Sequence, residues 1–309
     1  MNTPLVSIIT TTWRSQRQQL QAALHSAVRQ TYRHLEIIVS DDSPEPDLAD
    51  MVSGMYDERL HYRHNVPALG VAANHARCIA EARGDFIVIL NHDDWLDATF
   101  VERLLQPLLN DASLALAFCD HWIVDVDGER RVAETEAASA RYGRAALALG
   151  RHRPFHQLLV DQTIPLAMGT LFRRSALSDL LPVNAGPAYD LWLTYLLCRN
   201  GQGAWYVPAR LSNWRTHAGN QTSLGSIELL AGAADCWAAI AADDRLASVR
   251  QAAAVRAELA YRACACWQLR HGNGCETRRY ALQALRYRVS PKSLAVYAAG
   301  LLPAGLLRS

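Results

Sequence analysis

The sequence is almost without lysine: Lys292 is the only one among 31 basic residues, and the others are all arginines. Acidic residues number 30, so the formal net charge is only +1. This balance excludes the strongly basic surface typical of nucleic-acid-binding proteins, and we expect no nucleic-acid partner. The arginine bias has two explanations, which are phosphate recognition by a rigid guanidinium fork and codon bias in a GC-rich genome.

The sequence also lacks the marks of secreted and membrane-spanning proteins. Its 7 cysteines are odd in number and contain no Cys-x-x-Cys pair, which argues against a disulfide framework and against a zinc site. The first residues show neither a charged leader region nor a cleavage site. No apolar stretch reaches the roughly 18 residues of a transmembrane helix. We therefore expect a cytoplasmic protein.

Alternating strand and helix patterns fill residues 1–225. Short apolar runs typical of buried strands alternate with segments in which apolar residues recur at helical spacing. The expected strands are 5–11, 35–40, 60–63, 85–90, 113–124, 168–173, 205–207 and 211–215, and the expected helices are 16–30, 47–55, 70–83, 98–108 and 190–198. Residues 133–153 indicate a helix and a loop. This order predicts an α/β fold with a doubly wound, mostly parallel sheet.

Residues 226–309 have a different character. They are Ala-rich with helical spacing and almost no strand signal, and we expect a separate C-terminal helical region of three to five helices. Apolar faces beside basic residues can dock on anionic lipid or on a membrane-bound partner. Peripheral contact with the inner face of the cytoplasmic membrane is therefore one expectation, and ordinary core helices are the alternative.

The most informative stretch is 84–94. Five apolar residues, Phe86 to Leu90, end abruptly in Asn91-His92-Asp93-Asp94. Such a run fits a strand buried on both faces, and open α/β sheets bind ligands at the carboxyl ends of their strands. Adjacent carboxylates there can hold a hard divalent cation, which in turn can hold a diphosphate. A strand end capped by acids is the plainer alternative.

Four polar clusters follow strand-like runs in this way. They are Thr11–Arg14, Asp41–Ser43, Asn91–Asp94 and Trp214–His217. In a parallel sheet the first three emerge at the same edge. The sequence has neither a Gly-rich dinucleotide fingerprint after its first strand nor a P-loop. A nucleotide bound at this edge would therefore be held by side chains, a metal ion and strand-end backbone.

These motifs, in this order, resemble the nucleotide-sugar domain of inverting family 2 glycosyltransferases, which have the GT-A fold. The similarity covers roughly residues 4–223. It is carried by the segments Val6–Arg14, Ser26–Tyr32, Glu36–Ser43, Asn65, Gly70–Asn74, Ala82–Asp85 and Asn91–Asp94. The resemblance is specific for the family and not for a substrate.

The resemblance implies a nucleotide site on the first two clusters. Thr11, Thr12, Trp13 and Arg14 would line the base and ribose. Asp41 matches the family acid that binds the base, and a carboxylate that accepts an imide N–H suits uracil or thymine; Asp42 is then structural. Asn74 lies on the following helix, where it either serves the nucleotide or is an ordinary polar residue of the helix face.

In the third cluster, Asn91-x-Asp93 stands where the family has Asp-x-Asp. Asn91, with His92 beside it, would contact the donor, since an amide still forms hydrogen bonds although one negative charge is lost. Asp93 would be the ligand of a Mn²⁺ or Mg²⁺ ion whose other ligands are phosphate oxygens and water. For Asp94 the alternative is a cap on a helix starting near Leu96.

The remaining implied roles lie in the second half of the chain. Asp190, before Leu191-Trp192-Leu193, would be the general base, although the family's Glu-Asp pair is missing there; the alternative is an acid that only favours the helix dipole. The segment 211–220 resembles the closing family motif, in which His217 would complete the metal shell and Arg215 would neutralise the diphosphate. Met168, Gly169 and Thr170 would line the acceptor side.

The sequence therefore predicts an inverting, metal-dependent glycosyltransferase. It would move a sugar from a nucleoside diphosphate donor, with UDP or dTDP favoured, to a hydroxyl of a glycan or lipid-linked acceptor during synthesis of a bacterial surface polysaccharide. A nucleotide-sugar-binding or scaffold protein without activity is the second hypothesis, motivated by Asn91 and the missing Glu-Asp pair. A nucleotidyltransferase is disfavoured because the Gly-rich, Lys-bearing loop of such enzymes is absent.

Overall fold

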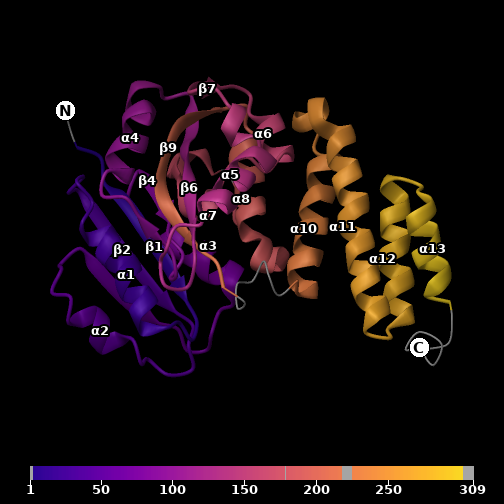
Figure 1. The fold of residues 1–309 in the computed structure, drawn as a ribbon, viewed down its shortest axis with the longest axis horizontal. Helices are drawn as coiled ribbons and strands as arrows, with labels where there is room; N and C mark the ends of the chain where they lie inside the picture. The colour runs from indigo at the N-terminus through magenta and orange to yellow at the C-terminus, as the bar shows by residue number, and fades with distance from the viewer. Residues whose placement is uncertain (1–2, 178, 218–224, 302–309) are drawn as a thin grey trace. The chain divides into compact units, whose positions relative to one another are not determined.

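The computed structural model describes residues 3–177, 179–217 and 225–301 (Figure 1). The chain divides into two compact units, Met1–Val183 with Leu196–Ala218 and Asn184–Tyr195 with Gly219–Ser309. The expected division at residues 225 and 226 fits the C-terminal helices. The segment Asn184–Tyr195, which the sequence pattern assigned to the first part, instead joins the second unit.

The first unit is built on one nine-stranded sheet with the order β3-β2-β1-β4-β8-β6-β9-β5, with β7 paired to β9. Its strands are β1 (Val6–Thr12), β2 (Leu35–Asp41), β3 (Leu60–His64), β4 (Phe86–Ile89), β5 (Trp95–Leu96), β6 (Leu114–Val124), β7 (Gly150–His152), β8 (Thr170–Arg173) and β9 (Gly203–Arg215). Strands β1, β2, β3, β4, β6 and β9 share one direction, and β5, β7 and β8 run against it. The expectation of a mostly parallel α/β sheet is confirmed.

The helices of the first unit follow the expected periodicity. They are α1 (Arg17–Val28), α2 (Ala49–Ser53), α3 (Val71–Glu81), α4 (Phe100–Asn110), α5 (Val132–Arg141), α6 (His156–Val160) and α7 (Leu166–Gly169). Helix α1 buries Leu20, Ala23, Leu24 and Ala27, which are the apolar positions recurring every three to four residues. These side chains join the strand residues in one hydrophobic core.

Strand β9 differs from the sequence expectation, which had two short strands at 205–207 and 211–215. The structure has one strand, and its pairing with β6 shifts register between Cys119 and Asp120 and again between Asp120 and His121. Exposed Pro208 lies in β9 at this irregularity, because a proline cannot donate to the ladder and is tolerated at a bulge. The short strand β7 was not expected.

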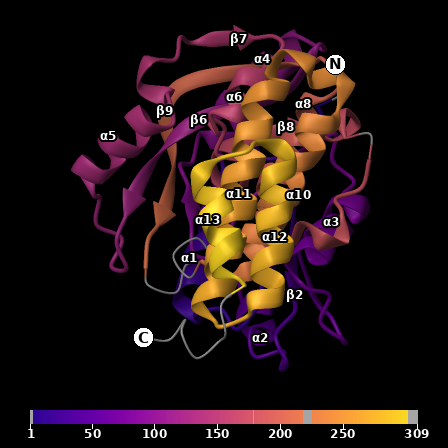
Figure 2. The ribbon, with the colours of Figure 1, turned by 90° about the vertical axis from the view of Figure 1, so that its right-hand side faces the viewer.

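The second unit is a helical bundle, as expected. It contains α10 (Ile227–Ala242), α11 (Arg250–Arg270), α12 (Gly274–Tyr287) and α13 (Pro291–Ala299), and Figure 2 shows these helices packed side by side. Helix α8 (Tyr189–Cys198) starts in this unit. Tyr261 and Cys264 of α11 pack with Ala234 and Ala284 in its core. Among the described residues, every helix is too short or too polar to cross a bilayer.

Candidate active site

Strand register brings the predicted polar clusters to one edge of the sheet. In the parallel pairs Thr12 lies opposite Asp41, and Asp41 lies opposite His64. Strand β4 is aligned with β1 so that the backbone N–H of Leu90 donates to the carbonyl of Ile9 at 3.0 Å. The segments after β1, β2 and β4 therefore leave the sheet at the same edge, as the sequence predicted.

The loop after β1 turns outward at Arg14, whose φ of 50° lies in the left-handed region. The Arg14 N–H donates to the Ser43 hydroxyl at 2.7 Å, and the Thr12 hydroxyl is bonded to that of Ser15. Trp13 is 57% exposed, and the Arg14 guanidinium lies 4.9 Å from its ring centre. The loop thus presents an aromatic ring and a cation to solvent, side chains suited to a base and a phosphate.

His75 of α3 supports this loop from below. Its Nε2 lies 3.2 Å from the Thr11 hydroxyl and its Nδ1 lies 2.8 Å from the Val71 carbonyl. Burial lowers the pKa of His75 to about 4, against the opposing influence of the Val71 carbonyl and of the Asp42 charge. The imidazole is therefore neutral at pH 7 and fixes Thr11 without adding charge. The sequence reasoning missed His75 because it lies inside a helix, away from any strand end.

Asp41 is fully buried and held at both oxygens. Its Oδ1 accepts from the Ser43 N–H at 2.9 Å, and its Oδ2 accepts from the Tyr62 hydroxyl at 2.7 Å. Burial, with the hydrogen bond to Asp41, raises the pKa of Tyr62, which stays a donor. The carboxylate is thereby held in one orientation at the sheet edge. Its contact with a nucleotide base stays a prediction.

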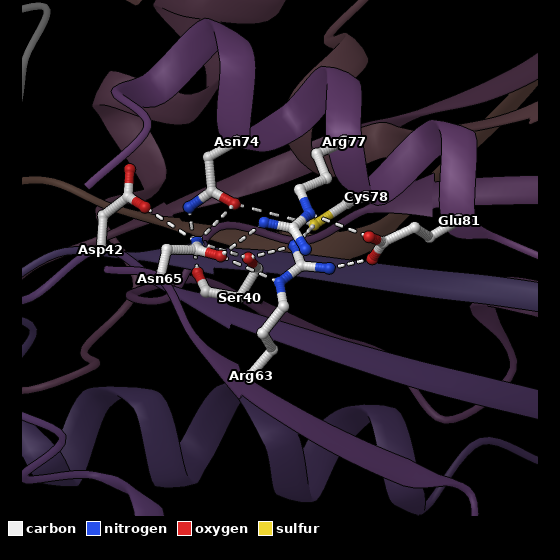
Figure 3. A network of polar contacts seen from close by, with 8 residues as sticks. All are labelled: Ser40, Asp42, Arg63, Asn65, Asn74, Arg77, Cys78 and Glu81. Atoms are coloured by element: carbon white, nitrogen blue, oxygen red, sulfur yellow. Dashed lines mark hydrogen bonds and ion pairs between the residues drawn. The ribbon is translucent and has the colours of Figure 1, made fainter. Parts of the chain in front are cut away.

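A buried polar network lies beside Asp41 (Figure 3). Asp42 accepts from the Asn65 amide at 2.8 Å and from the Gly70 N–H at 2.9 Å. Gly70 has a φ of 83°, which a side chain would strain. Asp42 therefore closes the β3–α3 connection, in agreement with the structural role expected for it.

Asn74 belongs to the same network. It is 1% exposed, its amide donates to the Ser40 carbonyl at 3.1 Å, and its Oδ1 accepts from Asn65. Arg63 adds a bond to the Ser40 hydroxyl at 2.6 Å and an ion pair with Glu81. These contacts fasten α3 to β2 and β3, so the structure shows Asn74 as part of the packing beneath the predicted base pocket.

Asp93 and His217 come together at the end of the sheet although 124 positions separate them in the chain. The Asp93 Oδ2 lies 3.2 Å from the His217 Nε2, and Asp93 is 9% exposed. The pairing arises because Arg215 ends β9 directly beside the loop that follows β4. In the described part of the chain, no three His, Cys, Asp or Glu side chains form a group able to hold a metal, so the pair is a half-built site at most.

Asp94 is turned inward, away from the role of a helix cap. It is 1% exposed, its Oδ1 accepts from the Arg215 N–H at 2.8 Å, and its Oδ2 accepts from the Asn91 amide at 2.9 Å. Burial and the charge of Asp93 raise the pKa of Asp94 well above its usual range, opposed by Arg215 and Asn91. The expected helix near Leu96 does not form: β5 follows Asp94, and α4 begins only at Phe100.

Arg215 is buried and bonded to main-chain oxygens. Its Nε donates to the Asp93 carbonyl at 3.0 Å, and one Nη donates to the carbonyls of Val126 at 2.5 Å and Asp125 at 3.3 Å. The guanidinium also lies 4.9 Å from the centre of the Trp95 ring. Arg215 therefore holds the loop that carries Asp93, and its contact with a diphosphate stays a prediction. Nearby, burial lowers the pKa of His92, which favours a neutral ring.

Asp190 lies in the first turn of α8, within the second unit. Its side chain is exposed, and its Oδ1 accepts from the N–H of Leu191 at 2.7 Å. Desolvation by the surrounding protein raises the pKa of Asp190, and the backbone bonds oppose the shift. A carboxylate that solvent reaches and whose pKa is raised suits a general base; the alternative, an acid serving the helix dipole, is compatible with its first-turn position.

The segment predicted to face the acceptor lies where α7 passes into β8. A Cβ on Gly169 would come within 2.7 Å of the Pro165 side chain and 3.3 Å of the Cys119 carbonyl, so only glycine fits there. Thr170 is fully buried and donates to the Pro165 carbonyl at 3.2 Å. Met168 is half-buried. Gly169 and Thr170 thus shape the segment, and acceptor contact stays a prediction.

Comparison with known proteins agrees with this arrangement. The sequence profile of the family described as Glycosyl transferase family 2 matches residues 7–181, which is more than half of the chain. An uncharacterized glycosyltransferase of Methanocaldococcus jannaschii is 27% identical over 131 residues, which cover 41% of this chain and 45% of that protein. The Escherichia coli UDP-Glc:alpha-D-GlcNAc-diphosphoundecaprenol beta-1,3-glucosyltransferase WfaP is 33% identical over 102 residues, 33% of this chain and 40% of WfaP. The chain spans about half or less of the length of these relatives.

Two solved structures share the fold. TarS 1–349 of S. aureus superimposes with a TM-score of 0.65 at 12% identity, covering 94% of this chain and 82% of that one. The same protein in complex with UDP-GlcNAc gives a TM-score of 0.62 at 13% identity, covering 96% and 79%. At such identities the likeness supports the fold, and the chemistry must be argued from the residues of this chain.

Proposed function

We propose, from the premise that the chain belongs to glycosyltransferase family 2, that it is a metal-assisted inverting transferase of nucleoside diphosphate sugars. The observation that carries the proposal is the meeting of Asp93 and His217 at the sheet edge where Thr11–Arg14 and Asp41 also emerge. Each comes from a different part of the sequence. Their convergence at strand ends is the arrangement by which open α/β sheets bind nucleotides.

The donor set fits Mn²⁺ or Mg²⁺. A carboxylate oxygen and an imidazole nitrogen suit such ions, which take few protein ligands when phosphate oxygens and water complete the shell. When bound, the ion would supply Lewis-acid stabilisation of the departing diphosphate. The chain's own part is to hold the Asp93 carboxylate beside His217, and the Arg215 bond to the Asp93 carbonyl does this.

Recognition of the nucleotide falls to the β1 loop and Asp41. The exposed Trp13 ring offers a stacking surface and the Arg14 guanidinium offers charge. A carboxylate at Asp41 favours an imide N–H, and therefore UDP or dTDP. One relative is named as a UDP-Glc transferase, and one solved relative carries UDP-GlcNAc, which supports a uridine donor.

Asp190 is our candidate for the general base. Its carboxylate takes the proton of the acceptor hydroxyl while that oxygen forms a bond to C1 of the sugar, on the face opposite the diphosphate. The bond from C1 to the diphosphate oxygen breaks, and the anomeric configuration inverts. Base assistance of this kind is worth roughly 10²- to 10⁴-fold in rate.

The acceptor is proposed to be a bacterial surface glycan or its lipid-linked precursor, the class to which WfaP's printed activity belongs. The bundle offers a route to a membrane: Val289 is 73% and Leu294 is 47% exposed, beside exposed Arg286, Arg288 and Lys292. Such a basic and apolar tip can bind anionic lipid at the cytoplasmic face. Co-sedimentation with anionic vesicles, and its loss when the three basic residues become Glu, would support this contact; equal binding to neutral vesicles would contradict it.

The proposal is tested by release of nucleoside diphosphate from a panel of UDP-, dTDP- and GDP-sugars with Mn²⁺. Donors are chosen first by thermal shift, because a ligand bound only to the folded state raises its stability. Turnover that falls at least 100-fold in Asp190→Ala supports the activity. The second candidate, a nucleotide-sugar-binding protein without catalysis, is favoured by Asn91 and the missing Glu-Asp pair, and it is the outcome if the wild type binds UDP but turns over no donor.

A further inference from the structure

Asn91 donates a hydrogen bond to the buried carboxylate of Asp94, and this contact gives the amide a purpose of its own. The Asn91 Nδ2 lies 2.9 Å from the Asp94 Oδ2. An ionised carboxylate only accepts hydrogen bonds, so its partner at this distance must be a donor. The aspartate of the family's Asp-x-Asp pattern could not make this contact, because it would set two carboxylates against each other.

The contact is one link in a closed chain of bonds. The Asp94 Oδ1 accepts from the Arg215 N–H at 2.8 Å, and the Arg215 Nε donates to the Asp93 carbonyl at 3.0 Å. We refer to Asn91, Asp94 and Arg215 as the clamp. It ties both ends of the Asn91–Asp94 loop to the end of β9. The carbonyl of Asp93 is fixed by the clamp, while its carboxylate lies against His217 at 3.2 Å.

We propose that Asn91 is a positioning residue: through Asp94 and Arg215 it sets the loop so that Asp93 alone presents its carboxylate to the metal and diphosphate. The inference rests on the proposed function. It reverses the simplest reading of the motif, in which Asn91 is a weakened version of the family's first acid. Restoring that acid should therefore damage the site, because the amide is matched to the buried Asp94.

The geometry provides a rescue. In the double variant Asn91→Asp/Asp94→Asn, the amide at position 94 would donate to the carboxylate at position 91 and accept from the Arg215 N–H. Both hydrogen bonds of Asp94 survive with one reversed in direction, and the net charge of the loop is unchanged. Asp94→Asn alone has one carboxamide oxygen for two donors, and Asn91→Asp alone has two facing carboxylates. Only the exchange satisfies every group.

The experiment is a cycle of wild type, both single variants and the double variant. It measures the melting temperature without metal or nucleotide, and calorimetric binding of UDP with Mn²⁺. We expect Asn91→Asp to lower the melting temperature by several degrees and to weaken Mn²⁺-dependent UDP binding about 10-fold or more. The double variant should recover to within about twofold of wild type in binding, which is the non-additivity that coupled neighbours show.

A matched control exists in the helical unit. The Asn184 Nδ2 lies 3.3 Å from the Asp235 Oδ2 on an exposed surface, so Asn184→Asp makes the same change against the same kind of partner in water. Charges exposed to solvent interact weakly. We expect no change in the melting temperature beyond about one degree and none in UDP binding.

Two results would overturn the proposal. One is Mn²⁺-dependent UDP binding that is kept or strengthened in Asn91→Asp, as direct ligation by that position would give. The other is coupling in the melting temperature without coupling in UDP binding, which would leave Asn91 a merely structural residue. A wild type that transfers no sugar would refute the proposed activity, but the binding cycle needs no transfer and would still decide the role of the clamp.

Discussion

Glu36 of β2 is the buried acid on which we expect the stability of the sheet to depend most. It is 2% exposed, and its Oε1 accepts from the Ser7 hydroxyl, from the Arg83 N–H at 2.6 Å and from the Gly84 N–H at 3.2 Å. Its Oε2 accepts from the Arg83 guanidinium at 2.8 Å. Burial alone would raise the pKa of Glu36, but the bonds from Ser7, Arg83 and Gly84 outweigh it, and the pKa is lowered.

The magnitude follows from these bonds. A hydrogen bond to a charged group is worth about 1.5–3 kcal/mol and a neutral one about 1 kcal/mol. Glu36→Gln keeps an oxygen for three donors but makes each bond neutral, so we expect a loss of about 2–4 kcal/mol. The Arg83 guanidinium is 69% exposed, and that pair adds at most about 1 kcal/mol. Glu36→Ala leaves the buried donors without an acceptor and should cost more than Glu36→Gln.

The assay is urea unfolding followed by hydrogen exchange in peptides of β1 and β2, because a chain of two units need not unfold in one step. Since the folded pKa is lowered, the stabilisation is present above the unfolded pKa and is lost as pH falls through the folded pKa. The difference between wild type and Glu36→Gln should therefore shrink on acidification. Exposed Glu58→Gln is the control, with an expected change below about 0.5 kcal/mol. A Glu36→Gln loss under about 1 kcal/mol, or one that grows in acid, would refute the reasoning.

Three further predictions concern single residues. Gly84→Ala should lower the melting temperature by several degrees, since its Cβ would lie 2.7 Å from the Ser7 nitrogen and 2.9 Å from the Leu5 carbonyl; an unchanged melting curve would contradict this. Asp190→Asn should reduce turnover about 10²- to 10⁴-fold with UDP affinity intact, and the wild-type acid limb should lie above that of an ordinary aspartate because the pKa is raised. An unaltered pH profile in Asp190→Asn would remove it as the base. His217→Ala should raise the Mn²⁺ concentration for half-maximal turnover about 10-fold; equal Mn²⁺ dependence would exclude it as a ligand.

Strand periodicity and strand-end polarity were enough to predict the sheet and its functional edge. The run Phe86–Leu90 and the clusters after β1 and β2 are local signals, and parallel pairing places such ends together without further information. The meeting of Asp93 with His217 was reached only through the resemblance. It depends on the pairing of β9 between β5 and β6, which no local pattern specifies.

The contacts inside the clusters could not be predicted. Asp94 was an alternative helix cap, yet its partner is the N–H of Arg215 at the far end of the domain. Arg215 was expected to face a diphosphate, and its described contacts include the carbonyls of Asp93 and Val126. A sequence shows which residue types are present at a site, whereas the pairing of donors with acceptors follows from packing, as does the support of Thr11 by His75.

The central claim is that Asp93 and His217 form the metal and diphosphate centre of this protein. Calorimetric titration of UDP in the presence and absence of Mn²⁺, with wild type and Asp93→Ala, tests it most directly. The account predicts that Mn²⁺ strengthens UDP binding by the wild type at least about 10-fold and has no effect on Asp93→Ala, whose fold is intact by melting temperature. Equal Mn²⁺ enhancement in the two proteins would contradict the account.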